Sequence, residues 1–145
     1  MGRIVVGVDG SDASREAFQW ALAEARLRGW SIRAVRAWSD PYVVTPGFGQ
    51  PEDFEPEALR EQARAALAAN VADVVGEASE VEVEQQIAEG SPAAVLIDSA
   101  GDADLLVVGS RGLGGFTGLL LGSVSQHCVA HAPCPVLVVR ASSHS

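Results

Sequence analysis

Short apolar runs alternate with helix-forming stretches along the chain, and this alternation limits the available folds more than any other feature. The runs Arg3–Asp9 and Ala103–Gly109 are short and almost continuously apolar, as is typical of strands buried on both faces of a sheet. The segments follow one another in the order βαβαβαβαβ. This order predicts a doubly wound α/β fold with a parallel sheet, right-handed crossovers and helices on both faces.

Local signals place the remaining elements. A strand is expected at Ser31–Trp38, directly after a helix that ends at Gly29. Val81 and Val83 alternate with glutamates, which predicts a strand with one face in water at an edge of the sheet. Helices are expected from residue 11 or 14 to 28 and over 56–75, 91–99 and 123–131, each beginning near a serine or a proline.

Length and composition predict one globular domain over residues 1–145. The chain has 145 residues, of which 48% are hydrophobic, and this is enough to bury an ordinary core. No apolar run approaches the roughly 18–20 residues that a membrane-spanning helix needs. The first residues, MGRIVVGVDG, lack the basic and long apolar regions of a signal peptide. We therefore expect a cytoplasmic protein with no membrane partner.

The charge distribution argues against a nucleic-acid partner. The formal net charge is −9, whereas affinity for a phosphate backbone comes largely from clustered cations. All ten basic residues are arginines, so a Walker A loop, whose lysine reaches the terminal phosphates, is absent from the sequence. A nucleotide that binds this chain must be held in another way.

The segment HCVAHAPC (127–134) contains four residues of metal-ligand type. His127 and His131 lie one helical turn apart, but Cys128 points elsewhere on a helix and Cys134 lies between two prolines. A structural zinc site needs four converging ligands, so buried thiols and a histidine near a helix C-terminus are the favoured interpretation.

The stretch 39–54, SDPYVVTPGFGQPEDF, is expected to be a long loop. It contains three prolines and two glycines and shows no periodicity. Both a lid over a binding site and a tolerated surface loop remain open.

The glycine-rich segment 109–125, GSRGLGGFTGLLLGSVS, is the strongest functional signal. If the strand order reverses after the third strand, Asp9 and Gly109 end neighbouring strands at the switch point where doubly wound sheets bind ligands. The segment ends at Gly122 and Ser123, where a helix begins. A helix N-terminus favours phosphate, and glycines allow close approach and positive φ. The segment therefore predicts a polyphosphate site without lysine.

Two other interpretations of this segment stay open. Ser123 and Gln126 fit a capping box, in which the serine serves its own helix. A glycine-rich crossover can also be only a flexible connection. The dinucleotide fingerprint GxGxxG does not fit, because Thr117 stands where it requires glycine.

Three regions of the chain resemble the universal stress protein family. Gly109, Gly112, Gly122 and Ser123 have the spacing of that family's ATP-binding signature. The opening VVGVDGSDAS and the closing SVSQHCVAHAPCPVLVVR are also similar to the family's two ends. The three regions occur in the family's order along essentially the whole chain.

The resemblance implies a fold, a ligand and an assembly. The fold is a five-stranded parallel sheet of order 3-2-1-4-5, Rossmann-like and similar to the adenine nucleotide alpha hydrolases. The ligand is ATP or a related adenine nucleotide, with Mg²⁺. The assembly is a homodimer through the last strand, Pro135 to Arg140. This strand is apolar and would lie at an edge of that sheet, where an exposed apolar strand favours a partner.

The family's contacts map onto three segments. Asp9 would hold the ribose or a water on Mg²⁺, although it can equally complement the dipole of the following helix. Arg111 would pair with a phosphate or stay solvated. Trp38 is expected in the core rather than against adenine. The implied binding residues are Gly7, Val8, Asp9, Ala37, Gly109, Ser110, Arg111, Gly112, Gly122, Ser123, Val124 and Ser125.

The sequence favours a regulatory nucleotide-binding protein of the stress response over an enzyme. It contains no GxSxG nucleophile elbow and no lysine beside the glycine-rich segment. A slow Mg²⁺-dependent ATP hydrolase that uses Asp9 is the first alternative. An interaction module that binds no nucleotide is the second.

Overall fold

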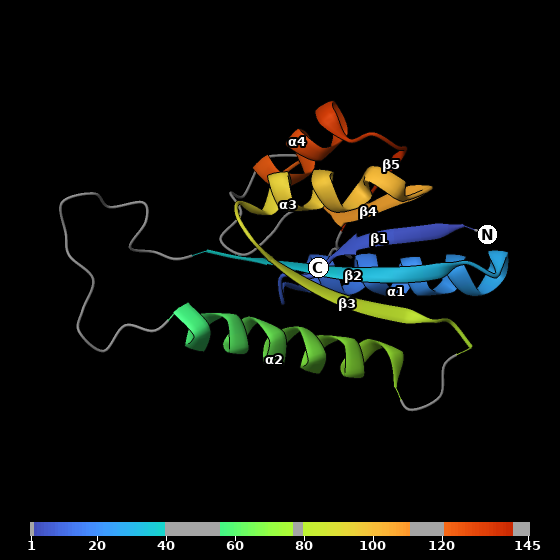
Figure 1. Ribbon diagram of the computed structural model, residues 1–145. Coiled ribbons are helices and arrows are strands. Elements are labelled where there is room, and N and C mark those ends of the chain that lie inside the picture. Colours follow the sequence, from blue (N-terminus) through green and yellow to red (C-terminus); the bar gives the residue numbers. More distant parts are fainter. Residues whose placement is uncertain (1, 40–55, 77–79, 111–120, 141–145) are drawn as a thin grey trace, which may run out of the picture.

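Five short parallel strands form the centre of the molecule, in the order β3-β2-β1-β4-β5 (Figure 1). The computed structural model describes residues 2–39, 56–76, 80–110 and 121–140. The strands are β1 (Arg3–Gly7), β2 (Ser31–Trp38), β3 (Val83–Glu89), β4 (Leu105–Gly109) and β5 (Val136–Val139). The predicted fold class and strand order are confirmed, and β3 and β5 are the two edges.

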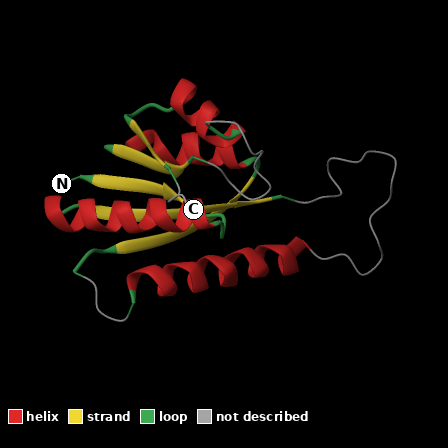
Figure 2. Ribbon diagram, turned by 180° about the vertical axis from the view of Figure 1, so that it is seen from behind, coloured by secondary structure: helices red, strands yellow, loops and turns green. Residues whose placement is uncertain are grey.

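Four helices cover the sheet, two on each face, as Figures 1 and 2 show from opposite sides. They are α1 (Asp12–Arg28), α2 (Pro56–Val75), α3 (Pro92–Ser99) and α4 (Ser123–His131), with a 3₁₀ turn η1 (Ala100–Asp102) after α3. None of the helices in the described ranges is long and apolar enough to cross a membrane.

Alternation along the buried strands creates two separate cores. Ile4 and Val6 of β1 pack under α1 and α2 with Phe18 and Leu67, and all four side chains are buried. Val5 points to the other face, into the cluster formed with α3 and α4. Each fully buried large side chain contributes about 1.5–3 kcal/mol through removal of apolar surface from water.

Helix α1 begins and ends at residues that satisfy its free backbone groups. The Ser14 amide donates to the hydroxyl oxygen of Ser11 (3.1 Å), which selects Ser11 over Ser14 as the N-cap. Gly29 adopts φ 71° and donates its N–H to Ala25. The start of α1 is therefore fixed next to the end of β1.

Gly109 at the end of β4 allows α1 to pack closely on the sheet. A Cβ atom at this position would lie 2.8 Å from the carbonyl carbon of Ala13 and 2.9 Å from its carbonyl oxygen. These are backbone atoms of a helix, so they cannot move aside cheaply. Glycine is needed here for packing, whatever else the residue does.

We predict that Gly109→Ala destabilises the fold by about 1–3 kcal/mol, because the added methyl group overpacks the contact between α1 and β4. Urea unfolding monitored by circular dichroism measures the effect. Gly101→Ala is the matched control, since a Cβ there meets no atom within 4 Å. Equal unfolding midpoints for the two variants would show that the contact at Ala13 imposes no constraint.

Candidate functional site

The ends of β1 and β4 lie side by side where the direction of the crossovers reverses. The two strands pair in register, with Val6 opposite Val107. The helix after β1 packs on one face of the sheet, whereas the helix after β4 packs on the other. This is the switch point at which doubly wound sheets bind ligands. It lies between the strands that end near Asp9 and Gly109, as predicted from the sequence.

Asp9 follows β1 and is tied to the start of α1. Its Oδ1 atom accepts hydrogen bonds from the Ser11 amide (2.9 Å) and the Ser11 hydroxyl (2.5 Å). Among the residues that the structure describes, none donates a hydrogen bond to Oδ2. One carboxylate oxygen is therefore bonded to the N-cap residue of α1, and the other is open to a further hydrogen-bond donor.

Gly7 and Val8 pair with β2 through their backbone at the end of β1. The Val8 amide donates to the carbonyl of Val35 (2.9 Å), which continues the pairing of β1 with β2 by one residue. Gly7 lies opposite Val35 in the register, so β2 extends past the end of β1. Ala37 stands on this extension, half-buried against the cluster under α3 and α4.

Trp38 departs from the expectation that it belongs to the core. It is half-buried at the end of β2 and is a member of neither buried cluster. The guanidinium carbon of Arg60 lies 6.0 Å from its ring centroid. Trp38 is the last residue of β2 and pairs with Glu89, the last residue of β3, so it lies where this part of the sheet ends.

Ser110 and Gly122 bring the two ends of the glycine-rich segment together. The Gly122 amide donates to the Ser110 carbonyl (2.6 Å), and the Ser110 amide donates to Val139 of β5 (2.8 Å). Gly122 has φ −75° and ψ 170°, an extended conformation that does not require glycine. The predicted contacts at Arg111 and Gly112 lie outside the described residues.

The N-terminus of α4 has the features of an anion site. Gly122 is the N-cap and provides no side-chain hydrogen bond, while the first N–H groups of a helix have no intrahelical acceptor. The capping box considered above is not formed, because the Gln126 side chain donates to the carbonyl of Leu121 (3.0 Å). Ser123 is the first helical residue and is exposed, so its hydroxyl is available to a ligand.

Ser125 has a different role from Ser123. It is 2% exposed, and its hydroxyl lies within hydrogen-bond distance of the carbonyls of Ser110 (3.1 Å) and Gly122 (3.0 Å). The hydroxyl is thus engaged inside the protein. Ser125 fixes the start of α4 against the end of β4, while Val124 packs against the cluster under α3 and α4.

We predict that replacing these two serines by alanine changes the unfolding free energy by different amounts. Ser125→Ala removes a buried hydrogen bond and should cost about 0.5–1.5 kcal/mol of unfolding free energy. Ser123→Ala should leave stability within about 0.5 kcal/mol of the parent, because the side chain is exposed. Chemical denaturation of both variants is the measurement, and a larger loss for Ser123→Ala would contradict this division of roles.

The two histidines of α4 and the two cysteines do not converge. Cys128 points into the protein from α4 and is fully buried, whereas His127 is exposed. Burial raises the pKa of the Cys128 thiol, which keeps it protonated. In the described part of the chain, no three side chains of histidine, cysteine, aspartate or glutamate are grouped as metal ligands. The four-ligand zinc alternative is thus not assembled there.

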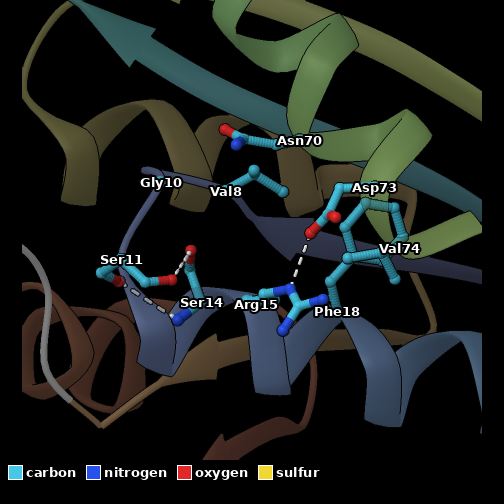
Figure 3. A pocket seen from close by; sticks show the side chains of 9 residues that line it. All are labelled: Val8, Gly10, Ser11, Ser14, Arg15, Phe18, Asn70, Asp73 and Val74. Atoms are coloured by element: carbon cyan, nitrogen blue, oxygen red, sulfur yellow. Dashed lines mark hydrogen bonds and ion pairs between the residues drawn. The ribbon is translucent and has the colours of Figure 1, made fainter.

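A small pocket between α1 and α2, lined by both polar and apolar residues, was not predicted from the sequence (Figure 3). It holds about 30 Å³ of space, enough for water but too small for a nucleotide base. Arg15 and Asp73 pair across it (2.7 Å), and Asn70 lines it from α2. The sequence offered one indication of this pocket, which is Asn70, a polar residue on the otherwise apolar side of α2.

Fold and site together define a doubly wound α/β protein with an uncapped helix N-terminus at its switch point. The sequence model of the universal stress protein family matches residues 1–140, and the chain belongs to this family. Universal stress protein Rv2005c of Mycobacterium tuberculosis (strain H37Rv) is 41% identical over 140 residues, which cover 96% of this chain and 45% of the relative. The chain spans less than half the length of the curated relatives that it matches.

Solved structures of similar proteins agree with this assignment. Universal stress protein UspA from Lactobacillus plantarum has a TM-score of 0.76 and 26% identity, with 96% of this chain and 97% of that one covered. A universal stress protein solved in complex with cAMP has a TM-score of 0.63 and 27% identity, with 97% and 98% covered. The second protein is thus a structural relative that binds an adenine nucleotide.

Proposed function

We propose that this chain binds ATP or a related adenine nucleotide at the switch point and acts as a regulatory protein of the stress response. The observation that carries the proposal is the start of α4, which lies at the end of β4 with an exposed serine and no side-chain cap. The cAMP complex of a relative supports the ligand class.

The phosphates would lie at the N-terminus of α4. Backbone N–H groups from Gly122 onward and the Ser123 hydroxyl would donate to them, helped by the positive end of the helix dipole. Gly112 would let the backbone approach closely, and Arg111 would pair with a phosphate oxygen. This phosphate-binding site would need no lysine, in agreement with a sequence whose basic residues are all arginines.

The nucleoside would extend from β4 across β1 toward β2. Asp9 would bind the ribose, or a water of a phosphate-bound Mg²⁺, through its Oδ2 atom, while Oδ1 stays with Ser11. A carboxylate oxygen is a ligand type that suits Mg²⁺ and its waters. Ala37, two positions beyond the last residue that pairs with β1, would meet the adenine through its backbone.

Nucleotide binding is tested with Ser123→Ala and Gly122→Val. Ser123→Ala should weaken ATP binding about 10-fold or more, because a hydrogen bond to a charged group contributes about 1.5–3 kcal/mol. Gly122→Val should abolish binding by placing a branched side chain beside the phosphates. Isothermal titration calorimetry of nucleotide-free protein with ATP and Mg²⁺ gives the affinities.

A matched control and a direct assay complete this test. Ser91→Ala removes another serine from the start of a helix, but beside the edge strand β3, and should leave the affinity unchanged. Freshly purified protein is also denatured, and released nucleotide is identified by mass.

Two outcomes would contradict the proposal. If no nucleotide is released and no heat is measured, the interaction module replaces this proposal. Multiple turnover that Asp9→Ala abolishes while binding persists would instead favour the hydrolase.

The dimer through β5 is part of the same proposal. All four side chains of β5 are only half-buried, although they are apolar. The carbonyls of Pro135 and Val139 accept hydrogen bonds from Leu106 of β4 and from Ser110 just after it. Strand alternation therefore directs the N–H groups of Val136 and Val138 to the open edge. A second copy of the chain would pair with these groups and cover the apolar side chains.

We predict that Val138→Pro converts a dimer to a monomer, because proline removes an outward N–H without breaking the pairing with β4. Gln85→Pro is the matched control: it removes an outward N–H from β3, the opposite edge, and should leave the dimer intact. Sedimentation velocity reports the state, and circular dichroism checks the fold. A parent protein that sediments as a monomer, or a Val138→Pro variant that stays dimeric, would exclude this interface.

A further inference from the structure

We propose that His127 and His131 form a two-histidine site for a divalent transition-metal ion, such as Ni²⁺, Cu²⁺ or Zn²⁺, on the outer face of α4. The site differs from the four-ligand zinc alternative, because it uses neither cysteine. It also does not depend on nucleotide binding, since both ligands lie beyond the first turn of the helix.

The two imidazoles occupy adjacent turns of one helix face. Residues i and i+4 lie one above the other on an α-helix, and both histidines are exposed. Their ring centroids are 6.2 Å apart, with an angle of 34° between the ring planes. Only side-chain rotations are needed to direct two ring nitrogens at one ion, which would lie in solvent-accessible space with water in its other positions.

A hydrogen bond already prepares one of the ligands. The Nδ1 atom of His127 lies 2.9 Å from the carbonyl oxygen of Ser123. A carbonyl oxygen only accepts, so Nδ1 carries the proton, and the lone pair of the neutral ring is on Nε2. Metal-binding histidines commonly have this arrangement, in which the non-ligating nitrogen donates to a backbone carbonyl and orients the ring.

Electrostatics favours a cation at this position. His131 lies in the last turn of α4, where the helix dipole is negative. The chain carries a net charge of −9, which raises the local concentration of divalent cations. Imidazole nitrogen suits nickel, copper and zinc rather than magnesium or calcium, so this site would not compete for the Mg²⁺ of a nucleotide.

The test uses tag-free protein and Ni²⁺ in a titration calorimeter. The parent chain should bind one Ni²⁺, and its thermal midpoint should rise with Ni²⁺ concentration, because the folded helix holds both histidines on one face and binds the ion more tightly than the unfolded chain does. His127→Gln and His131→Gln should each weaken binding by about 10-fold or more, since either change removes the chelate.

Three further variants make the outcome decisive. His144→Gln and Cys134→Ser remove another imidazole and a thiol, and should leave the affinity unchanged. The double variant Val129→His with His131→Gln keeps two histidines on the exposed helix surface but places them at i and i+2, which do not face each other, so affinity should not recover. Binding that survives His131→Gln, or that is lost with His144→Gln or Cys134→Ser, would overturn the proposal.

Discussion

Ser110 connects three elements by hydrogen bonds, and the geometry of the candidate site depends on this junction. Its N–H reaches the last residue of β5, while its carbonyl accepts from the Gly122 amide and lies within reach of the Ser125 hydroxyl. Ser110 itself is buried, so water does not compete for these bonds. These hydrogen bonds hold the first turn of α4 at the carboxyl end of β4. Its free N–H groups therefore lie at the switch point.

Much of this arrangement follows from pattern alone. Continuous apolar runs predicted buried strands, because a parallel sheet covered on both faces leaves no side of β1 or β4 in water. Helices between the strands then require crossovers, which limit the possible topologies and place the ligand site at a strand end. The position of the glycine-rich segment was therefore predictable from the order of the elements.

The roles of individual side chains were less predictable, because they depend on contacts between distant segments. Ser123 and Ser125 are both serines in the first turn of one helix, yet one is exposed and the other donates to a carbonyl 15 positions earlier. The contact of Ser110 with Gly122 and Ser125, which lie at the two ends of the glycine-rich segment, shows which serine points inward. Trp38 likewise looked like a core residue by type, and its partial exposure reflects its place at the end of β2, opposite the last residue of β3.

Gly109 changes what the glycine signature of this chain says about ligand binding. The packing of α1 on β4 favours glycine at this position, because a Cβ there would lie 2.8 Å from the carbonyl carbon of Ala13. A protein of this architecture would keep that glycine even if it had lost its ligand. Gly109 by itself is thus weak evidence of nucleotide binding, and a search that weights all positions of the signature equally would count a packing constraint as evidence of function.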